Sequence, residues 1–176
     1  YSLRYPEEAN YYTPSLATND GYSKLTEEYK DLLINAYDNT IRYTDYVLDE
    51  LIEWADTLNQ KVVLMYISDH GESFWDDERK LSLHGSYELS DAEYHVSCFL
   101  WYSNEYEQAH PEKVAMMKRN KDVAQNSGVV FSTLLDIANI TEAVDSTRSL
   151  CSPYIHNIDS FPVLNGAGEV KNYVIQ

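Results

Sequence analysis

The spacing of apolar residues changes along the chain: a helical period gives way to short continuous apolar runs and then returns. Residues 24–59 carry apolar side chains at a period of about 3.6 residues, which predicts one long amphipathic helix. Its apolar stripe runs through Leu25, Tyr29, Leu32, Leu33, Ala36, Tyr37, Ile41, Thr44, Leu48, Leu51, Ile52, Ala55 and Leu58. The runs at 61–68 and 95–103 are short, apolar and rich in β-branched and aromatic residues, which is typical of buried strands. A further apolar stretch predicts a second helix around 128–138.

Strands separated by helices predict an α/β/α sandwich with an open, mostly parallel sheet. Residues 1–23 are rich in turn-forming residues such as Gly21, which predicts an irregular lead-in. A polar loop is expected from the end of the first strand to about residue 92. Residues 24–149 form the expected folded unit. The tail at 150–176 is loop-like, with a terminal hairpin expected where NGAG supplies the Asn and Gly of a tight turn.

Composition narrows the class of protein. The chain has 176 residues, enough for one domain with a sizeable core, and its hydrophobic fraction of 44% with 16 Tyr argues against disorder. Its 29 acidic and 13 basic residues give a formal charge of -16, which repels phosphate backbones, so nucleic acid is not an expected partner. No apolar run approaches the ~20 residues of a membrane-spanning helix, and no signal peptide opens the chain. Because the first residue is Tyr rather than Met, we expect the chain to be part of a longer protein.

The two cysteines say little about the compartment. Cys98 lies in an apolar run and is expected to be a small buried residue, whereas Cys151 lies in a loop-like stretch. A disulfide between them stays open as an alternative. No Cys-x-x-Cys pattern supports a zinc knuckle.

Candidate chemistry gathers where the first strand stops, in YISDHGESF. Open sheets place their sites beyond the carboxyl ends of the strands, and Asp69 and His70 stand at that position. A carboxylate oxygen and an imidazole nitrogen are a ligand pair that suits zinc, and Gly71 permits the sharp bend that turns both toward one point. Glu72 would bind a second metal or hold His70 in one tautomer. His84, beside another glycine in LHGS, would face the same crevice and bind or protonate a phosphoryl group.

Each of these residues also has a purely structural interpretation. An Asp-His pair after a strand is more often a solvated loop or a helix cap than a ligand pair, and a single histidine such as His84 is more often a surface residue. His95 is expected at a strand edge, and His110 and His156 are expected on the surface. Only the combination of a strand, DHGES and a downstream His-Gly favours a functional site.

The same residues carry a family resemblance. YISDHGES followed by LHG resembles the metal-binding signature of the alkaline phosphatase superfamily, in particular its sulfatase-like, membrane-anchored phosphoethanolamine transferases. The opening YSLRYP resembles the family's Tyr-x-x-Arg-Tyr-Pro segment, and AYDNTIRYTDYVLDELIEWA resembles a helix of that family. HVSCFLWYS resembles the strand that usually begins His-Val-Pro. The resemblance covers about residues 1–140 and implies an alkaline-phosphatase-like fold, with 24–149 the carboxyl-terminal part of a catalytic domain.

The resemblance implies roles for four positions. Asp69 and His70 match two zinc ligands, and His84 matches a histidine near the transferred phosphate or near a second zinc. Glu72 lies in the motif without an assigned role. Two departures, Ser86 in place of the usual residue after His-Gly and Ser97 in place of the usual proline, affect the acceptor side of the site.

The remaining parts of such a site are expected outside this sequence. The resemblance places a Glu ligand, a Thr nucleophile and a further His in the amino-terminal half of the family's catalytic domain, together with membrane-spanning helices. Zinc would activate the Thr hydroxyl toward a phospholipid donor, and the covalent phosphoethanolamine enzyme would pass the group to an envelope glycan such as lipid A. The implied location is the bacterial inner membrane, with the catalytic domain in the periplasm.

Alternatives remain at this point. The superfamily also contains sulfatases, phosphodiesterases and phosphoglycerol transferases that share the Asp-His pair, and a non-catalytic module would keep the fold alone. The isolated chain is expected to be inactive, because two ligands fall short of the three or four that zinc sites use. An uncovered sheet edge or apolar face would favour self-association of the isolated chain.

Overall fold

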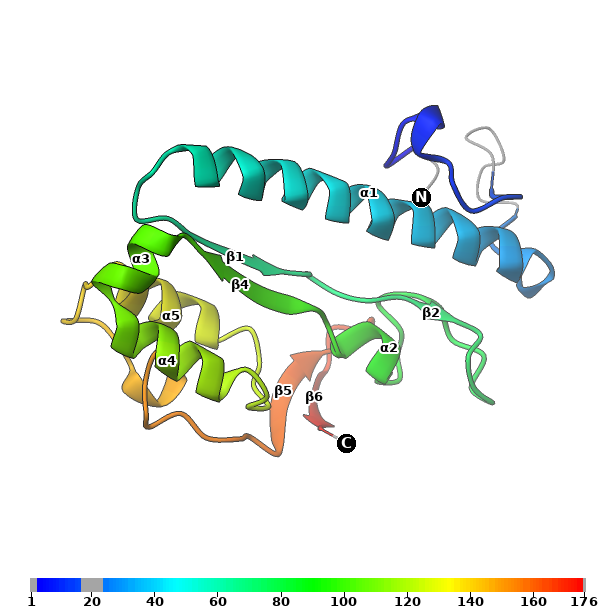
Figure 1. Ribbon diagram of the computed structural model, residues 1–176. Coiled ribbons are helices and arrows are strands. Elements are labelled where there is room, and N and C mark those ends of the chain that lie inside the picture. The colour runs from blue at the N-terminus through cyan, green and yellow to red at the C-terminus, as the bar shows by residue number, and fades with distance from the viewer. Residues whose placement is uncertain (1–2, 17–23, 176) are drawn as a thin grey trace.

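The computed structural model describes residues 3–16 and 24–175, in which helices alternate with short strands (Figure 1). The helices are α1 (Lys30–Thr57), α2 (Asp91–Tyr94), α3 (Asn104–Ala109), α4 (Pro111–Asn120) and α5 (Val129–Ile137), with 3-10 turns η1 (Glu7–Ala9), η3 (Glu27–Tyr29) and η4 (Ser146–Arg148). The strands are β1 (Val63–Ile67), β2 (Ser73–Phe74), β3 (Ser82–Leu83), β4 (Cys98–Tyr102), β5 (Ser160–Leu164) and β6 (Val170–Val174). The predicted α/β class is confirmed. Both main helices and both strands lie where the pattern predicted them. The expectation that the strands are buried is wrong, because every residue of β1 is half-buried and Cys98 and Phe99 of β4 are exposed. The helices α3 and α4 occupy a region that gave no clear pattern.

The pair β1–β4 forms the centre of the molecule. The two strands are antiparallel, with Val63 opposite Tyr102 and Ile67 opposite Cys98. The expectation of a mostly parallel sheet is therefore wrong for the described strands, because β2 with β3 and β5 with β6 are antiparallel as well. The reason is local. The chain between β1 and β4 carries a small hairpin and α2, and it stays at one end of the ladder instead of crossing back along a helix.

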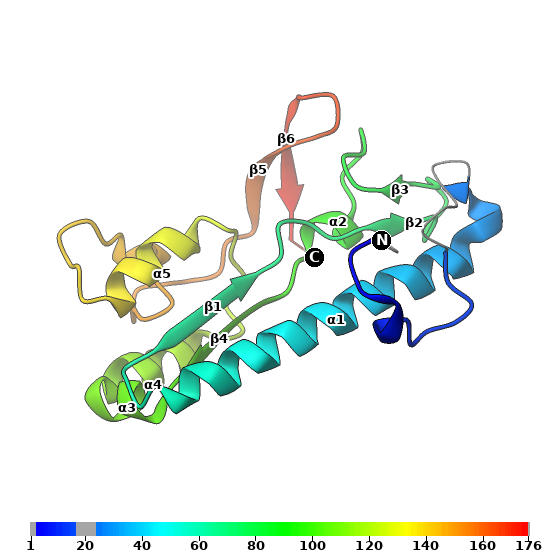
Figure 2. The ribbon, with the colours of Figure 1, turned by 90° about the horizontal axis from the view of Figure 1, so that it is seen from above.

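Helices lie on both sides of this ladder (Figures 1 and 2). In Figure 1, α3, α4 and α5 lie below it, and their side chains form one buried cluster with the tail. That cluster consists of Tyr106, Val114, Met117 and Cys151, packed against Val63, Leu100, Tyr102 and Ile137. Burying these apolar side chains is what holds the lower layer to β1 and β4.

The two cysteines are both free. Cys151 belongs to the buried cluster, and burial raises the pKa of its thiol to about 11. Cys98 is exposed, so the expectation that it is a buried residue is wrong. It stands at the first position of β4 and lines a cavity.

The long helix α1 packs through its first half and exposes apolar side chains along its second half. Leu33 and Ala36 join Leu16 and Phe74 in a second buried cluster. Farther along, the predicted apolar stripe is only partly buried, because Leu51 and Leu58 are exposed. Val47 and Trp54, which lie outside that stripe, are exposed as well, Trp54 at 61%. Figure 2 shows α1 running beside the β1–β4 pair rather than squarely over it. Exposed apolar side chains in such a row favour burial against another protein segment. Self-association of the isolated chain through them stays a prediction.

Asn39 ties the amino-terminal segment to α1. Its side chain is fully buried, and its carbonyl oxygen accepts hydrogen bonds from the backbone N–H groups of Tyr11 and Tyr12 at 2.9 and 2.8 Å. Its amide nitrogen donates to Asn10 Oδ1 at 2.8 Å and to the Tyr12 carbonyl at 3.1 Å. A buried amide that satisfies backbone groups in this way fixes an otherwise irregular segment.

Replacing Asn39 with Ala is expected to lower the free energy of unfolding by about 2–4 kcal/mol, because it removes a fully buried amide that makes several hydrogen bonds. The Tyr12 N–H loses the Asn39 carbonyl oxygen as its acceptor, whereas the Tyr11 N–H keeps the Ala9 carbonyl at 3.0 Å. The Asn10 side chain and the Tyr12 carbonyl lose the Asn39 amide nitrogen as a donor. Urea unfolding of the protein measures this loss. The exposed Asn172 on β6 provides the matched control, and its change to Ala is expected to stay within about 0.5 kcal/mol. Equal unfolding midpoints for the two variants would contradict the prediction.

The two terminal segments agree with their expected character where they are described. Residues 3–16 are irregular apart from the 3-10 turn η1, while Gly21 and the rest of 17–23 lie outside the described residues. In the tail, β5 and β6 pair as a hairpin around the NGAG turn, with Leu164 opposite Val170. The expected domain limits at residues 23 and 149 stay predictions. None of the helices in the described ranges combines the length and apolar character that crossing a bilayer requires.

Candidate metal centre

The segment after β1 is held against α2, and this contact sets the position of His70. The Ser68 N–H donates to the Ser97 carbonyl at 3.0 Å, which continues the β1–β4 pairing to the last residue before the bend. The Gly71 N–H then donates to the Glu93 carbonyl at 2.9 Å. A Cβ on Gly71 would lie 2.0 Å from the Ala92 carbonyl oxygen, so only glycine permits this approach.

A two-strand hairpin brings the downstream histidine back to the same place. In the antiparallel pair β2–β3, Phe74 lies opposite Ser82 and Ser73 lies opposite Leu83. Continuing this register by one position places Glu72, just before β2, opposite His84, just after β3. The side chains meet, with His84 Nδ1 2.9 Å from Glu72 Oε1. The small hairpin is thus the element that brings the LHG segment next to the DHGES segment.

His70, Glu72 and His84 form a cluster in which one ligand atom from each lies within 4.8 Å of the others. The imidazole rings of the two histidines face each other at 3.8 Å between centroids, with 31° between their planes. The Glu72 side chain is only 6% exposed, while that of His84 is 52% exposed. Glu72 Oε2 is buried and finds no hydrogen-bond partner among the described residues. A buried carboxylate oxygen in this state fits a site for a cation, because burial without a partner is otherwise costly.

His70 also forms a pair with Asp69. Its Nδ1 lies 2.9 Å from the Gly71 carbonyl, and since a carbonyl only accepts, Nδ1 carries the proton and Nε2 keeps its lone pair. His70 Nε2 lies 3.7 Å from Asp69 Oδ2. Two ligands of one tetrahedral zinc, at about 2.0–2.1 Å from the ion, stand roughly 3.3 Å apart, so this pair is close to the geometry that zinc requires. Asp69 is 88% exposed and lies outside the three-residue cluster.

The structure therefore gathers all four sequence-predicted site residues, Asp69, His70, Glu72 and His84, at one end of the central ladder. Glu72 contacts His84 directly rather than His70, which was the expected partner for a tautomer-fixing carboxylate. Which of these residues bind metal and which act on substrate stays a prediction.

The other three histidines lie apart from this cluster. His95 is exposed and follows α2, where its N–H donates to the Asp91 carbonyl. His110 is half-buried against the ring of Tyr106 at 4.8 Å, so the expected surface position is only partly correct. His156 is exposed, as expected.

Tyr37 lies near two carboxylates of the site, those of Glu72 and Asp69. Tyr37, on α1, packs its ring 5.3 Å from that of Phe74, next to Glu72. Burial raises the pKa of Tyr37, and the nearby carboxylate of Glu72 raises that pKa further. The phenol of Tyr37 is thus held in its neutral form, and the carboxylates of Asp69 and Glu72 supply the charge that a divalent cation would balance.

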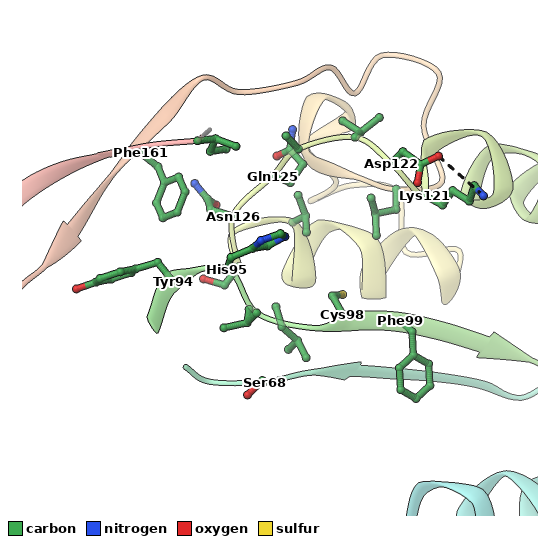
Figure 3. A pocket seen from close by; sticks show the side chains of 18 of the residues that line it. Ser68, Tyr94, His95, Cys98, Phe99, Lys121, Asp122, Gln125, Asn126 and Phe161 are labelled. Carbon is green, nitrogen blue, oxygen red and sulfur yellow. Dashed lines mark ion pairs between the residues drawn. The ribbon is translucent and has the colours of Figure 1, made fainter. Parts of the chain in front are cut away.

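Asp69 and His70 line one part of a cavity of about 1000 Å³. Figure 3 shows other residues that line the same cavity. It lies between β4, the segment that joins α4 to α5, and the hairpin β5–β6. His95 and Cys98 point into it, whereas Phe99 points to the opposite side of β4, as neighbouring residues of a strand do. The cavity has room for part of a substrate next to the candidate metal ligands.

Sequence reasoning missed Glu93. This carboxylate is 3% exposed, although it lies on the short helix α2 within a polar stretch. An acidic residue in such a stretch is normally solvated, so no sequence signal marks it. Its partners, described below, are the backbone of the segment that carries His84.

Comparison with known proteins gives a family match. A sequence model of the sulfatase family matches residues 1–140. Phosphoethanolamine transferase EptA of Salmonella typhimurium is 33% identical over 145 residues, which cover 80% of this chain and 25% of that protein. Phosphoethanolamine transferase EptA of Helicobacter pylori is 37% identical over 109 residues, or 61% of this chain and 20% of that protein. The chain thus spans about a quarter or less of the length of these curated relatives.

Solved structures share the fold. The carboxyl-terminal periplasmic domain of phosphoethanolamine transferase EptC from Campylobacter jejuni matches with a TM-score of 0.72 and 32% identity. That match covers 89% of this chain and 48% of the solved domain. The corresponding EptC domain of Escherichia coli, solved in complex with zinc, matches with a TM-score of 0.77 and 22% identity. It covers 98% of this chain and 47% of that domain.

Proposed function

The chain belongs to the sulfatase family, and from this premise we propose that it is the carboxyl-terminal half of the catalytic domain of a zinc-dependent phosphoethanolamine transferase. The alkaline-phosphatase-like fold that the resemblance implied agrees with the solved periplasmic domains. The similarity to two phosphoethanolamine transferases supports phosphoethanolamine as the transferred group. The rest of the domain, including the nucleophile, would come from residues outside this sequence.

One observation carries the proposal, namely that two pairs of donors meet at one end of the ladder. Asp69 Oδ2 and His70 Nε2 stand 3.7 Å apart, and the buried oxygen Glu72 Oε2 lies in the adjoining cluster with His84. This donor set fits zinc, which takes carboxylate oxygen and imidazole nitrogen ligands. We assign Asp69 and His70 as the residues that would hold it. Bound zinc would supply a Lewis acid that lowers the pKa of a hydroxyl nucleophile such as the expected Thr.

His84 would act on the phosphoryl group. Its Nδ1 faces the Glu72 carboxylate at 2.9 Å, and an N–H at this position donates to that carboxylate. Glu72 thereby orients the imidazole and leaves Nε2 as the atom that meets substrate. In its doubly protonated imidazolium form, His84 would donate a hydrogen bond from Nε2 to a phosphoryl oxygen or protonate the leaving oxygen. A role for His84 near a second zinc is the alternative that its place in the three-residue cluster supports.

The substrates and location follow from the same proposal. The donor would be a phospholipid that carries phosphoethanolamine, and the acceptor an envelope glycan such as lipid A. A relative from Escherichia coli, Kdo(2)-lipid A phosphoethanolamine 7''-transferase, is 29% identical over 128 residues. The catalytic domain would then lie in the periplasm and the whole protein would be anchored in the inner membrane.

The test compares the intact protein with the isolated 176-residue chain. The intact protein is expected to bind zinc and to move phosphoethanolamine from phosphatidylethanolamine vesicles to a lipid A acceptor, followed by mass spectrometry. The isolated chain is expected to be inactive, since it brings only part of a zinc ligand set. Hydrolysis of a sulfate ester without phosphoethanolamine transfer would instead assign the protein to the sulfatases. Turnover by the isolated chain would contradict the expectation that the nucleophile and the remaining zinc ligands come from residues outside this sequence.

A further inference from the structure

The segment that carries His84 has little packing of its own. We define residues 84–87 as the His84 loop. The His84 side chain is half exposed, and Gly85 has a φ of +76° with open space where a Cβ would stand. Glu72 contacts the imidazole itself at 2.9 Å. A glycine next to this exposed side chain gives the backbone freedom, so the position of the loop backbone must be fixed by contacts made elsewhere in the loop.

Glu93 supplies the first of these contacts. Its Oε2 accepts hydrogen bonds from the backbone N–H groups of Gly85 at 2.9 Å and Ser86 at 3.3 Å. Its Oε1 accepts from Ser73 Oγ at 3.2 Å. Because Glu93 is 3% exposed, these donors are what satisfies its buried carboxylate. The helix α2 is thus tied to both the His84 loop and the start of β2.

The carboxyl-terminal hairpin supplies the second contact, from the other side of the loop. The Gly166 N–H donates to the Ser86 carbonyl at 2.8 Å, and Asn165 Nδ2 donates to the Tyr87 carbonyl at 2.9 Å. A Cβ on Gly166 would lie 1.6 Å from the Gly85 carbonyl oxygen, so the turn of the hairpin touches the loop backbone directly. Figure 2 shows this turn beside the segment that follows β3.

The hairpin is anchored on α2, the helix that carries Glu93, both near its open end at Tyr173 and next to its turn at Leu164. Tyr173 Oη donates to Asp91 Oδ1 at 2.6 Å, and Tyr94 Oη donates to the Leu164 carbonyl at 3.2 Å. The ring of Tyr173 packs against those of Tyr94 and Phe161 at 5.4 and 5.3 Å. Burial raises the pKa of Tyr173 to about 12, and the hydrogen bond to Asp91 raises it too, so the phenol stays a donor. Hairpin and α2 therefore hold the loop from a common base.

We propose that Glu93 and the hairpin β5–β6 form a clamp that positions His84, with Glu93, Asn165 and Gly166 as its positioning residues. The effect of the clamp on catalysis depends on the proposed function, because the clamp acts only through His84. Residues 160–174 lie beyond residues 1–140, which match the sulfatase model, so the clamp is built partly from a segment that the family model does not cover. Fixing a catalytic group in advance lowers the barrier, and misplacing it by about 1 Å costs up to about 10²-fold in rate.

The first test is Gly166→Ala in the intact protein. The added methyl group pushes the turn away from Gly85, and kcat for phosphoethanolamine transfer is expected to fall about 10–100-fold with KM for the donor little changed. The matched control is Val170→Ala, an exposed position on the same hairpin, which is expected to keep kcat. Equal kcat values for Gly166→Ala and the control would overturn the clamp.

A double-mutant cycle separates positioning from general stability. Adding Gly166→Ala to a His84→Ala protein is expected to change kcat no further, because the residue that the clamp positions is already gone. A loss in the double variant as large as in the single variant would show that the hairpin acts independently of His84 and would refute the proposal.

Glu93 gives an independent arm. Glu93→Gln keeps an oxygen that accepts from Gly85 and Ser86 and an amide that can donate to Ser73, so near-native kcat is expected. Glu93→Ala removes the acceptor and is expected to lose about 10–100-fold in kcat. Similar losses in both variants would contradict the role assigned to the hydrogen bonds.

A spectroscopic readout keeps the clamp separate from the proposed function. The imidazole NMR resonances of His84, assigned by their loss in His84→Ala, are expected to shift or broaden in Gly166→Ala and to stay in place in Val170→Ala. Shifted resonances in a protein that transfers no phosphoethanolamine would support the clamp and reject the proposed function. Unshifted resonances would overturn the clamp whatever the activity.

Discussion

The Asp69→Ala and His70→Ala variants of the intact protein are expected to lose bound zinc and to fall in kcat/KM by about 10³-fold or more. The Lewis-acid contribution of a metal amounts to several kcal/mol, and about 4 kcal/mol corresponds to about a thousandfold in rate. Asp69 Oδ2 and His70 Nε2 stand 3.7 Å apart, so either change removes half of the pair proposed to hold the ion. Zinc analysis of the purified variants and transfer assays with phosphatidylethanolamine measure the two effects.

The matched control is Asp49→Ala, because Asp49 is an exposed aspartate on α1 outside the site residues described above. This variant is expected to keep both zinc and activity. Full zinc content in Asp69→Ala together with full activity would show that Asp69 is not a metal ligand. The Asp69 side chain is 88% exposed, so its replacement disturbs little packing and the loss of zinc can be assigned to the carboxylate. Retention of zinc by His70→Ala would refute the assignment of the imidazole, whose free Nε2 is the basis of the proposal.

The second large effect is expected for His84→Ala, which should lower kcat by about 10²–10⁴-fold, the usual contribution of a positioned acid or base. Glu72 Oε1 faces His84 Nδ1, so the change also removes the imidazole that is the hydrogen-bond partner of this buried carboxylate. Zinc held by Asp69 and His70 should remain. Transfer kinetics and zinc analysis of the same preparation test both statements.

The exposed His156 provides the control for His84, and His156→Ala is expected to keep the wild-type kcat. Loss of one of two zinc ions in His84→Ala would favour the alternative role near a second metal, since His84 lies in the cluster with His70 and Glu72. Unchanged kcat in His84→Ala would remove His84 from the reaction and, with it, the catalytic consequence of the clamp.

Several features of the fold could be predicted because they depend on local pattern. The period of α1 and the apolar runs of β1 and β4 appear in the sequence, since each element must bury one face. The position of Asp69 and His70 at the end of a core strand follows from the same reasoning. The α3–α4 region gave no clear pattern because polar and charged residues predominate in it, and its buried apolar side chains are few: Tyr106, Val114 and Met117. The equally short α5 was predictable because most of its residues are apolar.

Other features could not be predicted because they depend on pairing between distant segments. The antiparallel direction of β4 results from where the chain returns to the ladder, which no apolar pattern encodes. The exposure of Leu51 on α1 reflects which layers are available to cover the helix, although its spacing is that of a buried stripe. Strands as short as β2 and β3, with 2 residues each, are too short to show a period at all.

The sequence by itself determined the chemical inventory of this protein: an acidic α/β chain whose first core strand ends in Asp69 and His70, with His84 a short distance along the chain. Tertiary structure alone decided that Glu72 meets His84, because the register of β2 and β3 sets which residues oppose each other. It also decided that Glu93 is buried and that Gly166 touches Gly85. The physical reason is that burial and hydrogen-bond partners come from the close approach of segments, whereas a sequence pattern reports only which face of one segment is apolar.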